Sequence, residues 1–242
     1  METEQTSSLQ PVQRQLRQLR WLLTSYRLSG LQHWPRGVPI KEPCGVDIGV
    51  EDPATRLAAL CQEIGDCRRC RLHQSRTNLV FGDGSAAARL LFVGEAPGFD
   101  EDRQGLPFVG RAGQLLDKMI QAMGMRRLDV YICNVVKCRP PQNRNPDADE
   151  VAACSPFLFR QIEAIQPVVI CLLGTYAAQT LLETNSSISQ LRGKQRYWRG
   201  IPVVATFHPA YLLRNPAQKA ASWSDLIKVM ELINKVRGAY DQ

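Results

Sequence analysis

Two short polar runs, far apart in the sequence, each follow an apolar stretch that is typical of a buried strand. Gly94-Glu95-Ala96-Pro97-Gly98 follows residues 89–93, and His208-Pro209-Ala210-Tyr211-Leu212-Leu213 follows residues 201–207. Open α/β sheets bind their ligands outside the carboxyl ends of their strands. Carboxylates and imidazoles at such positions are groups that enzymes use to exchange protons and to stabilise charge. The two runs therefore predict an active site.

A third apolar stretch, residues 131–136, contains a polar side chain. It reads Tyr-Ile-Cys-Asn-Val-Val, with Asn134 inside the expected strand. A buried amide requires a hydrogen-bonding partner. Two interpretations are open: Asn134 bonds neighbouring backbone at the end of the strand, or its amide contacts a ligand.

Four of the eight cysteines have the spacing of a metal site. Cys67 and Cys70 form a Cys-x-x-Cys pair, and fifteen residues separate Cys138 from Cys154. A Cys-x-x-Cys turn presents two thiolates to one metal, and two distant cysteines can complete a four-sulfur site. The spacing suits zinc and iron–sulfur chemistry alike, and the alternative is that Cys67 and Cys70 are ordinary helix-end residues. We interpret the other four as non-ligands, namely Cys44, Cys61, Cys133 and Cys171.

The distribution of charge is consistent with a nucleic-acid partner. The chain has 242 residues and a formal net charge of +7. Residues 1–52 hold six Lys or Arg and six Asp or Glu, so the whole excess lies in residues 53–242. Positive charge on a domain is what binding to a phosphate backbone requires. Because many basic proteins bind no nucleic acid, the charge supports DNA binding without selecting it.

Neither a membrane span nor a signal peptide is expected. No apolar run approaches the roughly 18 residues that a spanning helix needs, and the amino terminus is rich in Gln, Ser and Arg. We therefore expect a cytoplasmic protein with no membrane partner. In that compartment cysteines stay reduced or bind metals rather than forming disulfides.

Apolar periodicity predicts alternating helices and strands after residue 52. The expected helices cover residues 53–64, 113–123, 147–165, 175–183 and 223–237, and the expected strands cover residues 89–93, 130–136, 168–173 and 201–207. Such alternation predicts an α/β fold of three layers, with a central, mostly parallel four-stranded sheet flanked by helices.

Residues 1–52 are expected to form an amino-terminal extension, separate from a catalytic domain in residues 53–242. A basic amphipathic helix is predicted from apolar residues three or four positions apart with arginines between them: Leu9, Val12, Leu16, Leu19 and Leu23. The Pro- and Gly-rich residues 30–53 predict a linker or an arm that wraps around the catalytic domain. Two roles for the helix are open: it docks on the catalytic domain, or it binds a protein partner.

Together, these runs resemble the family 4 uracil-DNA glycosylases, the iron–sulfur branch of the uracil-DNA glycosylase superfamily. The resemblance rests on Cys67-Arg68-Arg69-Cys70, the Gly94–Gly98 run, residues 107–113 (Pro-Phe-Val-Gly-Arg-Ala-Gly), residues 134–141 (Asn-Val-Val-Lys-Cys-Arg-Pro-Pro), Cys154 and the run that begins at His208. It implies an enzyme that flips uracil out of DNA and hydrolyses its N-glycosidic bond, leaving an abasic site for base excision repair. It also implies a 4Fe-4S cluster on Cys67, Cys70, Cys138 and Cys154. We expect a monomer whose partner is uracil-containing DNA.

The resemblance implies a role for each motif around the flipped base. Asn134 would donate to uracil O4 and accept from N3–H, a pattern that cytosine cannot match. Phe108 would stack on the base, and His208 would stabilise the uracil anion as it departs. The glycine turn would line the pocket with Gly94, Ala96 and Pro97.

The residues expected to contact DNA lie in the last third of the chain. The resemblance aligns Leu212 with the superfamily's wedge leucine, which fills the gap left by the flipped base; Tyr211 or Leu213 could take its place. Basic residues expected to reach phosphates include Arg192, Lys194 and Arg214, although a solvated charged loop is the default interpretation of such residues.

One position departs from the best-known uracil-DNA glycosylases. Their corresponding turn carries an Asp that is thought to position the attacking water, whereas this chain, like family 4, lacks it and has Ala96. Glu95, or the acidic run at Asp100 and Glu101, would replace it. We favour Glu95 as a catalytic residue, because a carboxylate beside the sugar stabilises a developing cation. Two alternative functions stay open: a glycosylase of broader range among deaminated bases, and a catalytically idle iron–sulfur domain that binds nucleic acid.

Overall fold

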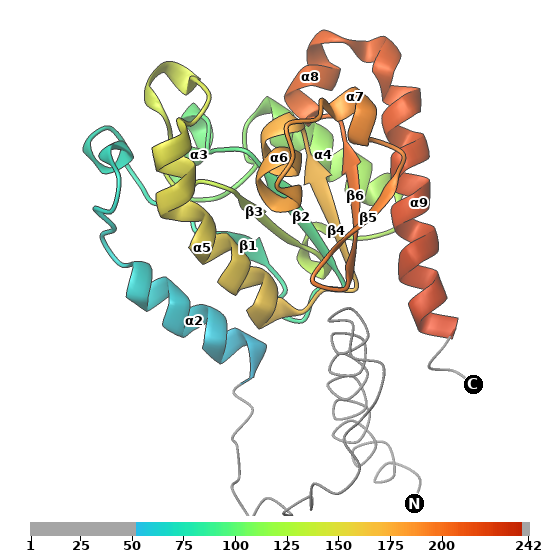
Figure 1. Cartoon of the computed structure of the whole chain (residues 1–242), viewed down its shortest axis with the longest axis horizontal. Helices are drawn as coiled ribbons and strands as arrows, with labels where there is room; N and C mark the ends of the chain where they lie inside the picture. Colours follow the sequence, from blue (N-terminus) through green and yellow to red (C-terminus); the bar gives the residue numbers. More distant parts are fainter. Residues whose placement is uncertain (1–51, 239–242) are drawn as a thin grey trace, which may run out of the picture. The chain divides into compact units, whose positions relative to one another are not determined.

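The computed structural model describes residues 52–238, with side chains as far as Lys235. The predicted amino-terminal helix, nearly all of the predicted linker and Cys44 lie outside these residues. The described part forms one sheet with helices on both faces (Figure 1). None of the helices in this part is long and apolar enough to cross a membrane.

Six strands form the sheet, in the order β1-β3-β2-β4-β6-β5. The four central strands run parallel: β3 (Tyr131–Asn134), β2 (Leu90–Gly94), β4 (Val169–Leu173) and β6 (Ile201–Thr206). They confirm the four strands predicted from the apolar stretches. Their carboxyl ends meet at one edge of the sheet, where Gly94 is the register partner of Asn134.

The two outer strands differ from the prediction of a four-stranded sheet. β1 (Asp83–Gly84) pairs antiparallel with β3, and β5 (Gln195–Trp198) pairs antiparallel with β6. β1 has two residues, and three of the four residues of β5 are exposed. The prediction missed both strands because neither has the apolar pattern of a buried strand.

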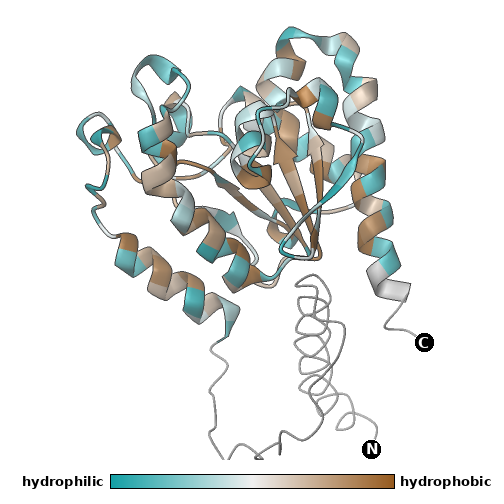
Figure 2. Cartoon of the chain, in the orientation of Figure 1, coloured by the Kyte–Doolittle hydropathy of each residue, from teal (hydrophilic) through white to brown (hydrophobic). Residues whose placement is uncertain are grey.

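Alternate residues of the central strands face opposite helical layers. In β2, Leu91 and Val93 belong to a core with α5 (Ala148–Ile165) and α6 (Thr175–Leu182). Leu90 and Phe92 belong to a second core with α4 (Arg111–Ala122) and α9 (Lys219–Gly238). Because helices cover both faces, the strands are apolar on both sides and form the hydrophobic centre of the structure (Figure 2). The predicted three-layer α/β fold is confirmed.

The helix α2 (Pro53–Ile64) packs against α5. Leu60 and Ile64 form a small apolar cluster with Phe157 of α5. The helix begins where Asp52 accepts a hydrogen bond from the Ala54 N–H, with proline at the first helical position. Its bounds are those predicted from the sequence.

Shorter helices and turns connect the main elements. They are α3 (Phe99–Gln104), α7 (Ile188–Leu191) and α8 (Pro209–Arg214), with 3-10 turns at Arg71–Gln74, Arg127–Asp129, Pro141–Asn143 and Pro216–Gln218. α3 follows β2, and α8 follows β6, so both begin at the sheet edge that carries the polar runs. In α8, Pro209 occupies the first helical position directly after His208.

Candidate active site and cysteine group

Three of the predicted site residues meet at the carboxyl edge of the sheet. Because Asn134 pairs with Gly94, β3 and β2 bring the amide beside the glycine turn. A Cβ atom added to Gly94 would lie 2.4 Å from Asn134 Oδ1 and 2.6 Å from Phe108 Cζ. The ring centroids of Phe108 and His208 are 5.5 Å apart. An amide, an aromatic ring and an imidazole therefore converge, and only glycine fits between the first two.

The Asn134 side chain is buried with an unused acceptor. It is 1% exposed, and no donor within residues 52–238 bonds its Oδ1 atom. Leaving a buried polar atom unpaired costs about 1–3 kcal/mol, so native structures rarely do it without a reason. The interpretation in which this atom bonds neighbouring backbone does not fit. A ligand that donates a hydrogen bond does.

The first turn of α8 orients His208. Its Nδ1 accepts a hydrogen bond from the Ala210 N–H at 3.1 Å, which leaves the ring proton on Nε2. Burial, with a smaller contribution from the positive charge of Arg214, lowers the pKa of His208 to about 4. The imidazole is therefore neutral near pH 7 and offers a single N–H donor close to Phe108.

The two glutamates near the glycine turn differ in their surroundings. Burial alone raises the pKa of Glu95 to about 7, and no hydrogen-bond donor of the described residues satisfies its carboxylate. Glu101 instead accepts from the backbone N–H groups of Gly98, Val109 and Gly110 at 2.8–3.1 Å. It ties the glycine turn to the loop after α3, so it does not fit the predicted alternative of a water-directing carboxylate.

Arg127 holds the loop that presents Phe108, and no sequence motif pointed to it. Phe108 has a left-handed backbone conformation (φ 52°), which is strained for an aromatic residue. Arg127 donates to the carbonyl oxygens of Phe108 at 3.1 Å and Pro107 at 2.5 Å, and pairs with Asp117 at 2.9 Å. Gly113 is also required, since a Cβ atom there would lie 1.9 Å from the Phe108 carbonyl oxygen. These contacts keep the ring in place despite the strain.

Leu212 lies in the core, which contradicts its predicted role as a wedge. It is 1% exposed and lines an apolar groove between α4 and α9, together with Trp223 and Leu226. Moving it into DNA would leave a cavity behind, at a cost of several kcal/mol. The next residue, Leu213, is 38% exposed at the end of α8.

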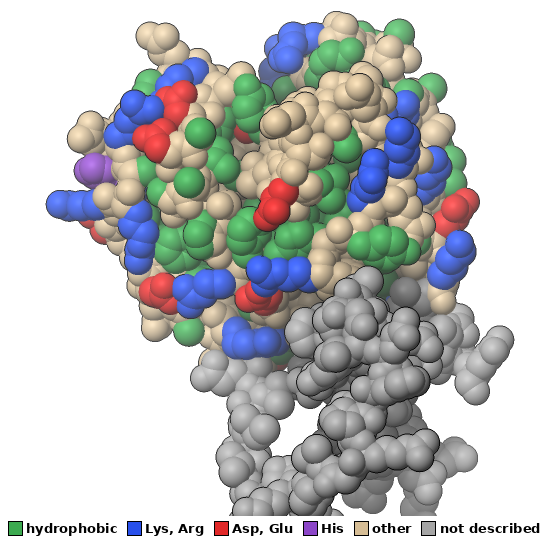
Figure 3. Space-filling model, viewed as in Figure 1, with side chains coloured by type: hydrophobic (Ala, Val, Ile, Leu, Met, Phe, Trp, Pro, Cys, Tyr) green, Lys and Arg blue, Asp and Glu red, His purple; other side chains and the backbone are tan. Residues whose placement is uncertain are grey.

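Arg192 is engaged inside the protein, which contradicts its predicted phosphate contact. Its guanidinium pairs with Asp225 at 3.1 Å and lies over the Phe207 ring, 5.1 Å from the centroid. Lys194 and Arg214 are exposed. Basic side chains gather over β5 and the neighbouring part of α9 (Figure 3).

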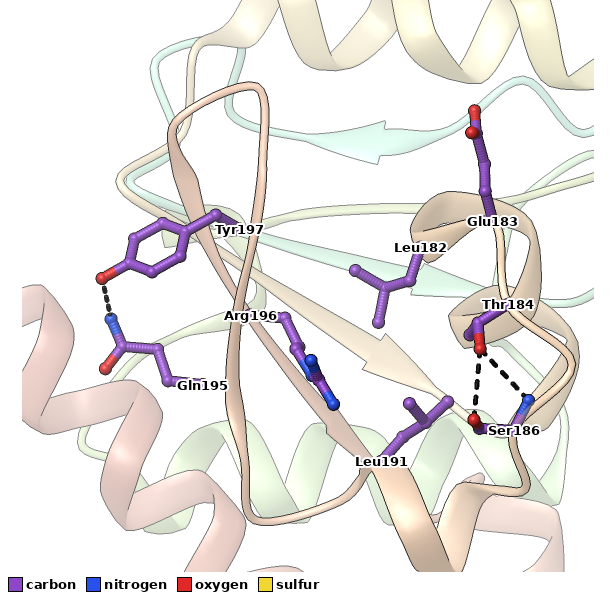
Figure 4. A pocket seen from close by; sticks show the side chains of 8 residues that line it. All are labelled: Leu182, Glu183, Thr184, Ser186, Leu191, Gln195, Arg196 and Tyr197. Atoms are coloured by element: carbon purple, nitrogen blue, oxygen red, sulfur yellow. Dashed lines mark hydrogen bonds between the residues drawn. The ribbon is translucent and has the colours of Figure 1, made fainter. Parts of the chain in front are cut away.

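A cavity of about 600 Å³ lies away from the predicted catalytic residues. It is open to solvent and is lined by residues of α6, α7 and β5, with Leu182 and Leu191 supplying apolar side chains (Figure 4). Arg196 and Tyr197 of β5 line it as well. None of the predicted base-contacting residues borders this cavity, so its size does not identify the active site.

Arg76 connects two of the segments that carry the predicted ligand cysteines, because its guanidinium donates to the Cys67 carbonyl oxygen at 2.7 Å and to Cys138 Sγ at 3.2 Å. Cys138 and Cys154 are buried, and Cys67 and Cys70 are half-buried. Burial raises the pKa of Cys138 to about 11 in spite of Arg76, and Cys154 and Cys70 contribute to the rise. Burial also raises the pKa of Cys154, and Cys70 and Cys67 contribute there. The thiols are therefore close enough to influence one another electrostatically.

Arginine side chains donate to two of the predicted ligand cysteines. Within residues 52–238, no three His, Cys, Asp or Glu side chains form a group that could hold a metal ion. Arg69 donates to Cys67 at 3.4 Å and Arg76 donates to Cys138 at 3.2 Å. Such donors stabilise the thiolate form that metals bind.

Comparisons with known proteins identify the family of the chain. Residues 81–227 match the model of the uracil DNA glycosylase superfamily. The chain is 46% identical over 187 residues to the type-4 uracil-DNA glycosylase of Archaeoglobus fulgidus. The alignment covers 74% of this chain and 94% of the relative. It is 51% identical over 161 residues to the type-4 uracil-DNA glycosylase of Thermotoga maritima, covering 66% of this chain and 84% of the relative. A type-5 uracil-DNA glycosylase of Pyrobaculum aerophilum is 32% identical over 146 residues, 53% of this chain and 64% of that protein. The chain therefore belongs to the uracil-DNA glycosylase superfamily and, within it, to the type-4 uracil-DNA glycosylases.

Proposed function

We propose that this protein removes uracil from DNA by hydrolysing its N-glycosidic bond, leaving an abasic site for base excision repair. The observation that carries the proposal is the unpaired Asn134 Oδ1, buried beside Phe108 and within reach of the turn that holds His208. Membership of the type-4 family supports uracil as the base. A flipped uracil supplies the N–H donor that this atom lacks.

The amide of Asn134 accounts for the choice of base. Its Oδ1 accepts from uracil N3–H, and its Nδ2 donates to O4. Cytosine has no proton on N3 and carries a donor amino group at C4, so both contacts would become repulsive. Phe108, held by Arg127, supplies the face on which the base stacks. The hydrogen bonds of Asn134 therefore explain the selectivity for uracil over cytosine without any contact to the opposite strand.

The bond breaks when negative charge moves onto the base and positive charge onto the sugar. His208 donates from Nε2 to uracil O2, where the developing anion strengthens the hydrogen bond. A neutral imidazole suffices for this, as the low pKa requires. Glu95 in its ionised form stabilises the sugar cation electrostatically. With Ala96 in the place of an Asp, no side chain at that position orients the water.

The cysteine group is proposed to hold a 4Fe-4S cluster on Cys67, Cys70, Cys138 and Cys154. When bound, the cluster supplies a cross-link between distant segments and a buried negative charge. Anaerobically purified protein should contain about four irons per chain, whereas stoichiometric zinc without iron would contradict the proposal. Cys138→Ala should lose iron, and the matched variant Cys171→Ala, in strand β4, should keep it.

The wedge that fills the emptied position in DNA is proposed to be Leu213. Its exposure at the end of α8 supports this role. Leu213→Ala should slow excision from duplex DNA by about tenfold and from single strands much less, since extrusion costs less there. Equal losses on the two substrates would remove Leu213 from the DNA contact. Lys194 and Arg214 are proposed as phosphate contacts, because both are exposed.

One assay tests the function directly. The protein is incubated with an oligonucleotide carrying a single uracil, and alkali then cleaves any abasic site. Parallel substrates carry cytosine, thymine, hypoxanthine or xanthine at the same position. Cleavage at uracil alone supports the proposal, cleavage at hypoxanthine or xanthine supports the broader glycosylase, and no cleavage at any base supports the idle binding domain. The division at residue 52, the monomeric state and the cytoplasmic location stay predictions.

A further inference from the structure

An exposed aromatic residue, Phe99, lies directly after the glycine turn. It is the first residue of α3 and is 57% exposed. The guanidinium carbon of Arg139 lies 5.1 Å from the centroid of its ring, a distance at which a cation and an aromatic face attract each other. Single exposed apolar residues are common and by themselves indicate no function. Phe99 differs from them because it is paired with a planar cation at the surface.

The pair joins the two chain segments that leave the candidate site. Gly94 and Asn134 are register partners, and the Val135 N–H continues the pairing by donating to the Gly94 carbonyl oxygen at 2.9 Å. Phe99 lies five residues after Gly94, and Arg139 lies five residues after Asn134. The two segments therefore stay together beyond the sheet and bring the pair to the edge where the proposed base-contacting residues lie.

The start of α3 is fixed to the loop that carries Phe108. The Glu101 carboxylate accepts from the N–H groups of Gly98 at 3.1 Å, Val109 at 2.9 Å and Gly110 at 2.8 Å. Gly98 precedes Phe99, and Val109 follows Phe108. Phe99 and the residue proposed to stack on uracil therefore belong to adjoining, hydrogen-bonded turns.

The other two carboxylates in the first turn of α3 are also directed toward the protein. Asp102 is 3% exposed and accepts from the Thr77 N–H at 2.8 Å. Asp100 lies against the Phe108 loop, since a Cβ atom added to Gly110 would lie 2.8 Å from its Oδ2. These contacts reduce the repulsion that the acidic turn would otherwise exert on a DNA strand at Phe99.

The turn after β3 holds the Arg139 guanidinium in place. Arg139 Nε donates to Asn143 Oδ1 at 2.7 Å. Gln142 and Asn143 both have a left-handed backbone with φ 55°, which asparagine tolerates and glutamine rarely adopts. Such conformations persist where the surrounding structure requires them, and they cluster at functional sites. Within residues 52–238, the two terminal nitrogens of Arg139 make no hydrogen bond, so a phosphate could bond them.

We propose that Phe99 and Arg139 form a platform on which an unpaired base next to the flipped uracil stacks, so that the enzyme favours uracil in single-stranded DNA. The proposal rests on the proposed function, because it requires DNA at this edge of the sheet. Aromatic rings bind unpaired bases of any sequence by stacking, and arginine adds to the attraction. In a duplex the neighbouring bases are already paired and stacked, so the platform contributes little there.

Phe99→Ala is the direct test, and because the side chain is exposed the variant should fold. Leu128→Ala is the matched control: Leu128 is 72% exposed in the turn that precedes β3, at the opposite edge of the sheet. Binding is measured with single strands that carry 2′-fluoro-deoxyuridine, whose glycosidic bond resists hydrolysis. Phe99→Ala should raise the Kd by about tenfold, and Leu128→Ala should change it by less than about twofold. An unchanged Kd for Phe99→Ala would overturn the proposal.

Two further variants and a duplex separate stacking from general apolar contact. Phe99→Tyr keeps a flat ring and should bind the single strand like the wild type, whereas Phe99→Leu should bind it as weakly as Phe99→Ala. On a duplex with the same uridine, Phe99→Ala should raise the Kd by less than about threefold, since no unpaired base is offered. Single-turnover excision at saturating DNA should be unchanged, because the platform acts in binding. Equal losses on both substrates, or wild-type binding by Phe99→Leu, would overturn the proposal.

A change in the DNA identifies a base as the occupant. The nucleotide on each side of the uridine is replaced in turn by an abasic tetrahydrofuran residue, which keeps the phosphate. The wild type should bind one of these strands about tenfold more weakly, and Phe99→Ala should bind it as well as the complete strand. Additive losses would show that Phe99 and the base act independently and would overturn the proposal. Failure of the proposed function is distinguishable, because binding requires no bond cleavage: a wild type that shows this coupling but excises no uracil would defeat the function alone.

Discussion

Two groups of buried polar side chains lie near the same edge of the sheet and differ in how they are satisfied. Between β6 and α9, Thr206 bonds Ser222 at 2.8 Å and Asp225 at 2.9 Å, and Asp225 pairs with Arg192. At the ends of β2 and β3, Asn134 Oδ1 has no partner in the described residues. The first group resembles an ordinary buried network, and the second resembles one that awaits a ligand.

The difference separates stability from function. A satisfied network contributes to the free energy of unfolding, because each of its groups would be left unpaired by a substitution. An unsatisfied buried group costs stability while no ligand is bound, so replacing it affects ligand binding much more than it lowers the free energy of unfolding. Substitutions in the two groups should therefore have opposite effects on unfolding and on excision.

Asn134→Asp should have the largest effect. The carboxylate repels uracil O4, and a site built to hydrogen-bond its substrate discriminates by about 10⁴-fold when the pattern is broken. Single-turnover excision of uracil should fall by about 10³-fold or more, while cytosine gains relative to uracil. Because the buried carboxylate has no counter-charge, the variant should also lose stability, so excision is measured at a temperature at which denaturation curves show it to be folded. Unchanged uracil excision would remove Asn134 from the pocket.

His208→Ala should follow, with a loss of about 10²- to 10³-fold in single-turnover rate, the usual cost of removing one donor to a developing anion. DNA affinity should be retained, because this hydrogen bond strengthens only in the transition state. Binding is measured with uncleavable DNA. A fall in affinity that matches the fall in rate would make His208 a binding residue instead.

Asp225→Ala tests the satisfied group. It leaves Arg192 and Thr206 without their shared partner, so the free energy of unfolding should drop by about 2–3 kcal/mol. Excision at a temperature where the variant is folded should change less than threefold, on the order expected for a residue outside the site. Glu63→Ala, which breaks the exposed ion pair with Arg160, should leave the urea midpoint nearly unchanged. An excision rate that falls by much more than about threefold while the free energy of unfolding is unchanged would contradict the comparison.

The pH dependence of Glu95 should give the smallest effect. Burial raises its pKa from 4.5 to about 7, so the carboxylate form predominates only above pH 7. kcat/KM should be about tenfold lower at pH 6 than at pH 8, and Glu95→Gln should lack this dependence. Stability changes in the opposite direction: the fold favours the protonated form, so Glu95 stabilises the protein at pH 4.5 and loses that contribution as pH rises through 7. A wild-type profile that matches Glu95→Gln would exclude Glu95 from catalysis.

The central strands and main helices could be predicted because local patterns dictate them. β2 and β4 are apolar on both faces, and α2 carries its start signal in Asp52 and Pro53. The edge strand β5 could not be predicted, since its residues are mostly exposed and polar. The order of the motifs along the chain likewise predicted Gly94, Phe108, Asn134 and His208 as site residues. The structure brings these four residues together, and their roles stay proposals.

By itself, then, the sequence determined the layered fold, the family and the approximate place of the site, because each depends on short patterns along the chain. Tertiary structure alone decided which side chains are free to act. Leu212 and Leu213 are adjacent and equally apolar, yet the packing of α8 buries one and exposes the other. Arg192 became structural because Asp225, distant in the sequence, pairs with it. Likewise, the burial of Lys137, whose ammonium bonds the Asn134 carbonyl oxygen and Gln161, follows from tertiary packing and from no sequence pattern.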